Sequence, residues 1–306
     1  MSNNDQIIFE NFISKEGVIP IWDNPYIKGN LHLPTDYRPA TTLESVLNLY
    51  KRMRYDEEDI RLLKVIGDAI CANEDQLRRY MNSLMSRSEV SKRLTRMRNV
   101  GLVYRWKMRT DDDKTKPPAP FTLGIAGYKF LKHYYNDTFF MSPDRWDDLG
   151  PKGIQRYVAL NEIRCQLVER KLAKKWVWNP ELKNNYYIKN PLAAAHITTD
   201  QGNFNFVIDR AQMSQNFVGY LRTKLNQWKE VHNSQGSLLL SDFPEDKPIL
   251  VLSVSTISLA AYIQEQLILD SYPFHIWLCV DEANDFTDAF YKPTEDGLKK
   301  IRLTFM

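Results

Sequence analysis

The chain has 306 residues, enough for two domains of ordinary size that each bury a hydrophobic core. Its 41 Lys and Arg residues against 38 Asp and Glu residues give a net charge of +3, so whole-chain charge does not identify a polyanionic partner. The three cysteines lack zinc-site or disulfide spacing, no apolar run reaches the roughly 18 to 20 residues that span a bilayer, and no signal-peptide pattern opens the sequence, which predicts a soluble cytoplasmic protein.

The first 44 residues are predicted to form an extended arm. Residues 1–44 are rich in Pro, Asn and aromatic residues and show neither helical nor alternating periodicity. The apolar content of this segment indicates that it packs on its own domain or on a second subunit. The next segment, 45–136, carries nineteen Lys and Arg residues against eleven Asp and Glu residues, which leaves a net charge of −5 for the rest. This asymmetry points to 45–136 as the polyanion-binding part.

Three short helical patterns follow in the basic segment. Asp56 and Asn73 are the predicted N-caps of the first two helices, because short oxygen-bearing side chains accept bonds from the free amides of a first turn. The third helix covers residues 86–99, and Val90, Leu94 and Met97 recur at the spacing of a buried face. Such a face leaves the basic residues of this helix directed mostly outward.

A hairpin follows the third helix. Gly101 is the predicted C-cap, residues 102–109 alternate as a strand, 111–118 form a polar turn and 121–123 return as a second strand. Three helices and a hairpin in this order predict a winged helix-turn-helix domain that binds double-stranded DNA. The expected DNA-binding residues are Arg87, Ser91, Lys92, Thr95, Arg96 and Arg98 on the third helix, and Lys107, Arg109, Lys114 and Lys116 on the wing.

The remainder of the chain is predicted to be a linker, 137–152, and an α/β domain, 153–306. Helices are expected at 154–173, 214–232 and 257–269, and strands at 193–199, 204–208, 249–254 and 274–280. Continuous apolar strands indicate a sheet that is covered on both faces. The order of helix, hairpin, helix and strand is that of a restriction-endonuclease-like core, so the fold class is α+β with a winged helix followed by this core.

The sequence resembles the replication-relaxation family of plasmid and mobile-element proteins. The resemblance lies in residues 93–103, 121–123, 127–128, 206–210 and 224–225 and spans most of the chain after residue 50. It implies a winged helix joined to a degenerate nuclease-like domain that acts in replication, mobilisation or transcriptional control.

A metal-dependent nuclease of this fold needs an acidic residue in the hairpin and Asp/Glu-x-Lys on the next strand. Asp209-Arg210-Ala211 lacks the lysine, Pro191-Leu192 stands where the first acidic residue is expected, and Asp200 in a turn is the nearest substitute. Lys224 on the following helix is the candidate for a displaced lysine. We therefore predict no enzymatic activity, no catalytic residue, no metal and no cofactor.

The favoured hypothesis is a sequence-specific DNA-binding protein that forms a homodimer, because two-fold sites are common for single winged helices. Two alternatives stay open. One is a nuclease that its winged helix directs to DNA. The other is an adaptor whose partner is a replication or transfer protein, an idea favoured by the acidic loop at 111–113.

Overall fold

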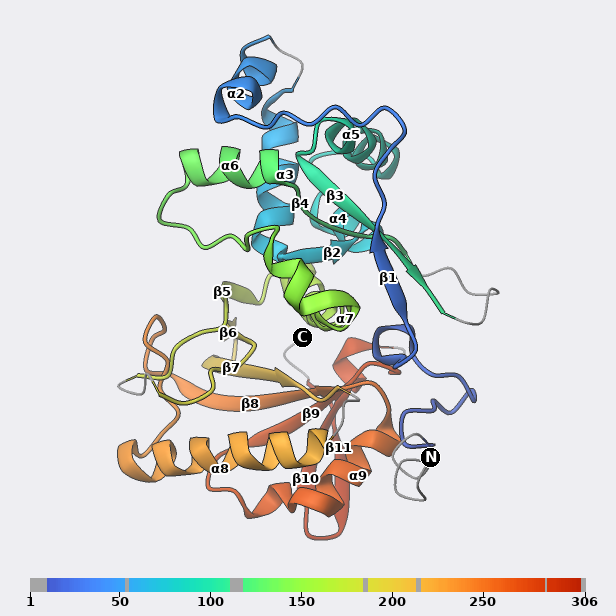
Figure 1. Ribbon diagram of the computed structural model, residues 1–306. Coiled ribbons are helices and arrows are strands. Elements are labelled where there is room, and N and C mark those ends of the chain that lie inside the picture. The colour runs from blue at the N-terminus through green and yellow to red at the C-terminus, as the bar shows by residue number, and fades with distance from the viewer. Residues whose placement is uncertain are drawn as a thin grey trace. The chain divides into compact units, whose positions relative to one another are not determined.

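The computed structural model describes residues 10–52, 55–110, 118–183, 187–212, 216–283 and 285–303. These residues form a mixed α and β structure with helices and two β-sheets. The chain divides into two compact units (Figure 1). The first, the helical unit, is Tyr26–Cys165, and the second, the α/β unit, combines Met1–Pro25 with Gln166–Met306.

The division between the units differs from the expected linker at 137–152. It falls within helix α7 (Arg145–Glu169), which bends at Gly150, where φ is 57°. The side-chain amide of Asn161 in α7 donates hydrogen bonds to the carbonyls of Ala69 (2.7 Å) and Cys71 (2.8 Å). Because Asn161 is fully buried, these bonds hold α7 to the helical unit.

The helical unit contains the three helices and the two hairpin strands that were predicted for the basic segment, whereas the predicted polar turn at 111–118 falls mostly outside the described residues. Its described elements are β1 (Lys28–Leu31), α2 (Leu43–Lys51), α3 (Glu57–Ala69), β2 (Cys71–Asn73), α4 (Glu74–Tyr80), α5 (Arg87–Asn99), β3 (Val103–Arg109), β4 (Pro120–Leu123), α6 (Ile125–Tyr134) and most of α7. Of these, β1, α2 and β2 were not expected from the sequence.

The predicted caps of the first two helices are confirmed. The Asp56 carboxylate accepts a bond from the backbone amide of Asp59, and the Asp59 side chain accepts one from the amide of Asp56. Asn73 and Gln76 make the same reciprocal pair at the start of α4. Each pair satisfies two backbone amides that have no partner within the helix, so the capping residues fix the first residue of α3 and of α4.

The third helix is anchored as the apolar spacing predicted. Val90, Leu94 and Met97 are buried in one core with residues of α3, α6 and the hairpin. Gly101 follows with φ of 74°, a conformation that favours glycine, and Gly127 of α6 packs directly on the backbone behind it. A Cβ at Gly127 would lie 2.1 Å from the carbonyl oxygen of Leu102, so only glycine permits this approach.

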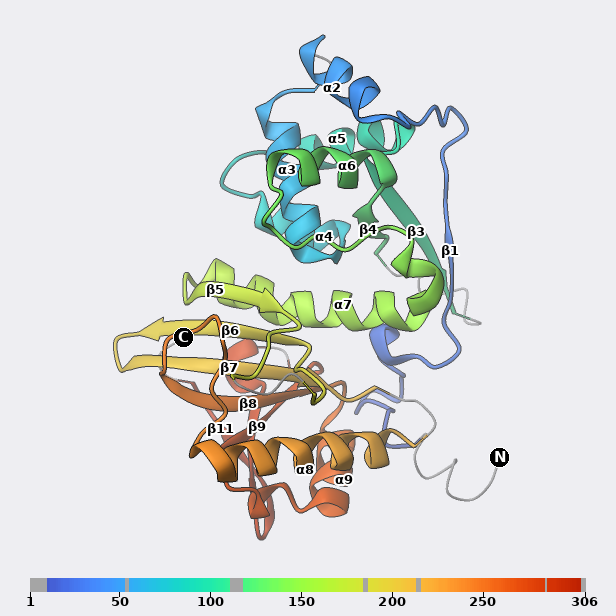
Figure 2. The ribbon, with the colours of Figure 1, turned by 60° about the vertical axis from the view of Figure 1, so that its left-hand side comes forward.

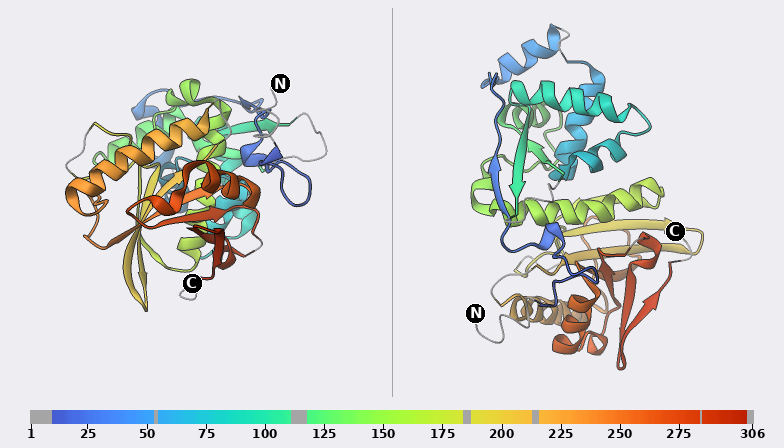
Figure 3. Two further views of the ribbon diagram at one scale, coloured as in Figure 1. Left: turned by 90° about the horizontal axis from the view of Figure 1, so that it is seen from below. Right: turned by 90° about the vertical axis from the view of Figure 1, so that its right-hand side faces the viewer.

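The sheet of the helical unit has the order β1-β3-β4-β2, with all neighbours antiparallel. β3 and β4 are the two strands of the expected hairpin; the acidic turn between them, including Asp111, lies outside the described residues. β1 comes from the segment that was expected to be an arm without regular structure. It lies alongside β3 (Figure 3) and makes the hairpin three strands wide.

The α/β unit is built on a seven-stranded sheet of described residues in the order β11-β10-β9-β8-β7-β6-β5. Its strands are β5 (Ala173–Trp178), β6 (Ala193–Thr199), β7 (Gly202–Arg210), β8 (Lys247–Val254), β9 (Ile276–Val280), β10 (Phe290–Thr294) and β11 (Gly297–Ile301), and its helices are α8 (Phe217–Gln235) and α9 (Ile257–Leu267) with the short turns η1 (Ile21–Asp23), η2 (Leu269–Ser271) and η3 (Phe286–Asp288). β5, β10 and β11 were not predicted.

The middle of this sheet is parallel. β7, β8 and β9 run in the same direction, whereas β5-β6-β7 and β9-β10-β11 are antiparallel meanders. α8 connects β7 to β8 and α9 connects β8 to β9, and both helices cover the same face (Figure 2). Their apolar sides share one core with alternate residues of the parallel strands, such as Leu250, Leu252 and Val254.

The described part of the arm before Pro25 packs into the α/β unit. Phe12 is fully buried in its core, and its ring lies edge-on to Phe217 of α8 with centroids 5.8 Å apart. The Thr256 hydroxyl at the start of α9 donates to the carbonyl of Asn11 (2.5 Å). The first segment of the chain is therefore a structural component of this unit.

Candidate functional site

The predicted DNA-binding residues of α5 differ in exposure. Arg87, Lys92, Thr95 and Arg96 are exposed, whereas Ser91 and Arg98 are half-buried. Thr95 donates its hydroxyl to the Ser91 carbonyl of its own helix (3.0 Å). The outward face of α5 is thus composed of polar and basic residues. Ion pairs with other helices determine how many of these basic side chains are available to a ligand.

Several basic side chains of α5 form ion pairs with carboxylates of the neighbouring helices. Arg87 pairs with Asp75 of α4 at 2.5 Å, and Arg96 pairs with Asp59 of α3 at 2.5 Å. The Arg87 pair is exposed on both sides, and such pairs contribute little to stability and exchange easily. The Asp59 side chain is only 2% exposed, so Arg96 compensates a buried carboxylate and is committed to the fold.

Ser91 is also engaged within the unit. Its hydroxyl donates to Glu74 (2.7 Å) and accepts a bond from Arg78 (2.7 Å), and Arg78 itself pairs with Glu74 at 2.6 Å. The three side chains join α5 to α4 through one closed network. Ser91 therefore lies at the outer surface of α5 and also holds α5 against α4.

Arg93, which was not among the expected DNA-binding residues, is the most heavily paired residue of α5. Its buried guanidinium contacts the carboxylates of Asp56 (2.6 Å), Glu58 (2.7 Å), Asp59 (3.0 Å) and Glu89 (2.9 Å). Burial alone would lower the pKa of Arg93, yet its hydrogen bonds to Asp56 and Asp59 raise the pKa above its ordinary value. The arginine ties α5 to the first turn of α3, a long-range contact that no local spacing reveals.

The strand β3 presents a second set of cations. Lys107 and Arg109 are exposed on one face, while Met108 between them is buried on the other. Lys92, Lys107 and Arg109 make no ion pair with any described residue. Lys114 and Lys116, the other wing residues predicted to bind DNA, lie outside the described residues.

Arg98 is directed at the arm. Its guanidinium donates to the carbonyl of His32 (3.1 Å) and lies 3.0 Å from the ring nitrogen Nδ1 of the same residue. Burial, reinforced by the charge of Arg105, lowers the pKa of Arg98 from its ordinary value. Arg98 thus holds the end of β1 against the C-terminal end of α5.

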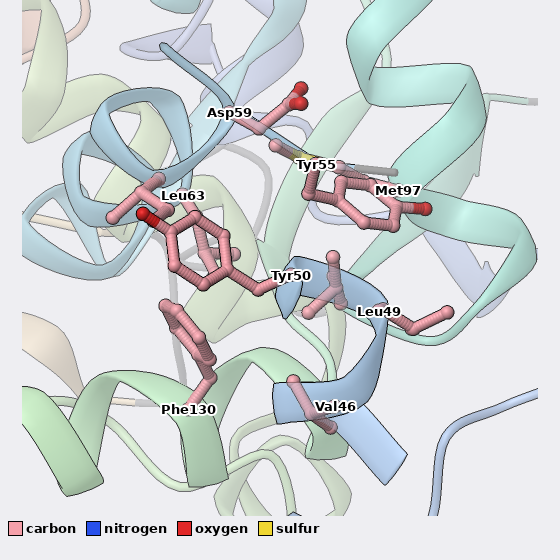
Figure 4. Close-up of a pocket in the computed structure, with 10 residues that line it drawn as sticks. Val46, Leu49, Tyr50, Tyr55, Asp59, Leu63, Met97 and Phe130 are labelled. Carbon is pink, nitrogen blue, oxygen red and sulfur yellow. The ribbon is translucent and has the colours of Figure 1, made fainter. Parts of the chain in front are cut away.

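A small pocket lies inside the helical unit between α2, α3, α5 and α6 (Figure 4). Its walls are apolar apart from Asp59 and the tyrosine hydroxyls, and its free volume of about 20 Å³ holds roughly one water molecule. A cavity of this size takes no organic ligand. The pocket lies where α2, the helix that follows the predicted arm, packs against the core of the helical unit.

The α/β unit contains a buried ion pair at the end of its middle strands. Asp209 at the end of β7 pairs with Lys224 of α8, and both side chains are almost completely buried. The Lys224 ammonium also lies 5.1 Å from the ring of Trp228. Lys224, the candidate for a displaced lysine, is therefore paired with Asp209.

The second acidic group of a nuclease core is not supplied by the predicted substitute. The last pair between β6 and β7 at this end is Ala193 with Ile208, so Asp209 lies beyond it, next to the position of Leu192. Asp200 lies in the turn at the opposite end of the same two strands. At about 3.3 Å per residue, the length of β7 separates Asp200 from Asp209.

Arg210, the next residue of β7, forms a separate buried cluster on the other face of the strand. It donates to the Ser253 hydroxyl (2.6 Å) and to Asp281 (2.7 Å), and it pairs with Asp23 of the arm at 3.1 Å. Burial raises the pKa of Asp23 to about 6, although Arg210 opposes this shift. Two carboxylates thus share one buried guanidinium.

The described residues contain no group of three or more His, Cys, Asp or Glu side chains placed to hold a metal ion, and no helix among them is long and apolar enough to cross a membrane. Cys71, Cys165 and Cys279 are buried thiols without a disulfide. No family model, no curated protein and no solved structure matches this chain.

Proposed function

We propose that the helical unit is a winged helix-turn-helix domain and that it binds double-stranded DNA. The observation that carries this proposal is the element order α3-β2-α4-α5-β3-β4, in which β2 pairs with the second strand of the hairpin. In winged helices of this order the third helix enters the major groove and the hairpin contacts the backbone. Here α5 takes the place of the recognition helix and β3-β4 that of the wing.

The surface chemistry supports a duplex as the ligand. Lys92, Lys107 and Arg109 are exposed and have no ion pair with another described residue, so they are available to phosphate oxygens. Arg87 becomes available when its exposed pair with Asp75 opens. Thr95 and Ser91 offer hydroxyls near the same face, which suit contacts to base edges or sugars.

The resemblance to the replication-relaxation family supports a role in replication, mobilisation or transcriptional control of a plasmid or mobile element. In this proposal the α/β unit is a degenerate restriction-endonuclease-like domain, the protein has no nuclease activity, and two copies bind an inverted repeat. The antiparallel β5-β6-β7 meander followed by α8 and the parallel strand β8 supports that assignment of the fold.

The proposal is tested by selection from fragmented DNA of the source cell with the full-length protein. The protein is incubated with the fragments at about 50 mM and about 200 mM salt, and the retained DNA is sequenced, because phosphate contacts weaken steeply over this range. Enrichment of a short inverted repeat at both salt concentrations is expected. Retention of DNA without enrichment would reject sequence specificity, and retention of no DNA at either concentration would reject DNA binding.

A second candidate function is an adaptor that binds another protein through the helical unit. The ion pairs of α5 with Asp75 and Asp59 favour it, since they neutralise charges that a DNA-reading helix normally leaves free. The same selection distinguishes the two functions. An adaptor retains no duplex at 50 mM salt, whereas a DNA-binding protein retains even non-specific fragments at that concentration.

A further inference from the structure

The sheet of the α/β unit has a second face, opposite the face that α8 and α9 cover. Successive residues of a strand point to opposite faces of a sheet. On β10 and β11, Tyr291 and Leu298 pack against the core beneath the two helices. Their neighbours Lys292 and Lys299, which are directly opposed in the antiparallel pair, therefore project from the second face.

Two further basic residues project from this second face. Phe274 is buried in the core beneath the helices, so the next residue, His275, points away from that core. Leu250 of β8 is buried in the same core, and Lys247 precedes it by three residues, which places Lys247 on the opposite face. The neighbouring strands β8 to β11 thus contribute one exposed basic residue each, at or directly before the strand, and we call the four residues the basic row: Lys247, His275, Lys292 and Lys299.

The positive charges of the basic row repel one another. Lys292 and Lys299 are like charges in directly opposed positions, an arrangement that destabilises a strand pair in the absence of an anion. Burial lowers the pKa of His275, and the charges of Lys247 and Lys292 lower it further. The three lysines make no ion pair with a described residue, so this repulsion is not relieved within the protein.

The acidic residues next to the basic row in the sequence do not compensate it. Glu295 and Asp296 form the turn between β10 and β11 and line a hollow against α9, on the other face of the sheet. Asp246 precedes Lys247, but its carboxylate lies 3.6 Å from the ring nitrogen Nδ1 of His196. The second face therefore keeps its positive charge.

The arrangement of the basic row suits an extended polyanion. Its members stand on adjacent strands about 4.8 Å apart, and lysines are point charges on flexible stems that do not form a fork around one small anion. A nucleic-acid backbone carries regularly spaced negative charges, and lysines bind them without reading the base sequence. The row begins at the amino ends of β8 and β9, whereas Asp209 lies at the carboxyl end of the parallel strand β7, so the row is distinct from a nuclease-like site.

We propose that the basic row is a second DNA-binding surface, on which Lys247, Lys292 and Lys299 hold the phosphate backbone of a duplex. This inference goes beyond the proposed function, because every residue of the row belongs to the α/β unit and that function assigns this unit no contact with DNA. The row supplies affinity that depends on salt and not on sequence. The degenerate nuclease-like domain then retains a DNA-holding role that needs no catalytic residue.

The test measures binding of the full chain to a fluorescent duplex over a salt series. Lys292→Ala and Lys299→Ala are each expected to reduce the slope of log K against log salt by about one, the value for one lost phosphate contact. Lys300→Ala is the matched control, because Lys300 is the exposed neighbour of Lys299 that projects from the other face of β11 and pairs with Asp288 at 3.4 Å. It is expected to leave the slope unchanged.

A charge reversal separates a binding role from a structural one. Lys299→Glu places a negative charge directly opposite Lys292, so it is expected to keep or raise the melting temperature. The same variant is expected to lower affinity for the duplex more than Lys299→Ala does, because it repels phosphate. A Lys299→Glu protein that melts as the wild type does and binds the duplex equally well would overturn the second surface.

Lys107→Ala, on the wing, distinguishes this inference from the proposed function. If Lys107→Ala lowers the slope while the Lys292 and Lys299 variants do not, DNA binding by the helical unit stands and the second surface is wrong. If only the Lys292 and Lys299 variants lower it, the second surface stands and the wing contact is wrong. A wild type that binds polyglutamate but no duplex at about 50 mM salt would overturn both and indicate an acidic protein partner.

Discussion

Lys224 of α8 and Asp209 of β7 form an ion pair inside the α/β unit, and their side chains are 2% and 4% exposed. Two charges that are removed from water remain stable only as a pair, because each alone carries a large desolvation penalty. The pair joins the helix that leaves β7 to the end of that strand. The contribution of this ion pair to the free energy of unfolding can be measured independently of catalysis.

Lys224→Met is expected to lower the free energy of unfolding by about 3 to 5 kcal/mol, because Asp209 then remains buried and unpaired. Urea unfolding at pH 7 measures the change. Combining Lys224→Met with Asp209→Leu removes both charges and is expected to restore part of the loss. The control is Lys183→Met, whose pair with Glu245 is exposed and whose effect is small. A Lys224→Met protein as stable as the wild type would contradict the buried pair.

Asp23 gives the α/β unit a specific pH dependence. Its pKa is about 6 in the folded chain, where burial raises it, against 3.8 for the ordinary carboxyl. The folded state therefore binds this proton more tightly than the unfolded state does. The stabilisation from protonated Asp23 is fully present below pH 3.8 and is lost as the pH rises to about 6. The loss is of the order of 3 kcal/mol.

Asp23→Asn isolates this contribution, because the amide does not titrate. Relative to the wild type, this variant is expected to show a difference in unfolding free energy that changes between pH 4 and pH 6 and is constant above pH 7. Chemical denaturation at closely spaced pH values measures the difference. A constant difference across the whole range would show that Asp23 does not titrate there.

Asp56 has two roles that two substitutions separate. It caps α3, and its carboxylate binds Arg93; burial would raise its pKa, but the Arg93 bond and the Asp59 amide lower it to about 2. Asp56→Ala removes both roles and is expected to cost about 1 kcal/mol or more in thermal unfolding. Asp56→Asn keeps a capping oxygen and loses only the charge, so it is expected to cost less. Equal losses from both variants would assign the effect to the Arg93 pair alone.

Gly127→Ala tests the contact between α6 and the backbone after α5. The added Cβ would meet the Leu102 carbonyl at 2.1 Å, and backbone cannot move aside as a flexible side chain can. We expect a loss of about 1 to 3 kcal/mol or more, measured by urea unfolding. Gly17→Ala is the control, since no atom lies within 4 Å of its Cβ and only its positive φ resists the change. A smaller loss at Gly127 than at Gly17 would refute the close approach.

The elements that the sequence predicted well are those whose signals are local. Asp56 and Asn73 precede their helices as capping residues do, and Val90, Leu94 and Met97 repeat at helical spacing, so α3, α4 and α5 were predictable with their burial. β1 was not, because four residues that include a glycine give no alternating pattern. Its strand conformation depends on the pairing with β3, which is about 80 residues away in the chain.

The exposure of most candidate residues on α5 was predictable from the sequence, but their ion pairs were not. The periodicity of α5 correctly left Arg87 and Arg96 exposed, yet it contained no information about Asp75 or Asp59, which come from other helices. Arg93 was missed for the same reason. Ion pairs between helices depend on tertiary packing, so the free charge on a helix face is known only once its neighbours are placed.

The α/β unit is discontinuous in the chain, since Phe12 and Asp23 belong to it while the helical unit lies between them and the rest. During synthesis these two residues leave the ribosome before Arg210 and the strands that bury them exist. The helical unit is therefore synthesised completely before the rest of the α/β unit. The segment that contains Phe12 and Asp23 has no packing partners in its own unit until about the last third of the chain has been synthesised. A fragment that starts at residue 166 would lack an aromatic ring from its core and one of the carboxylates beside its buried guanidinium.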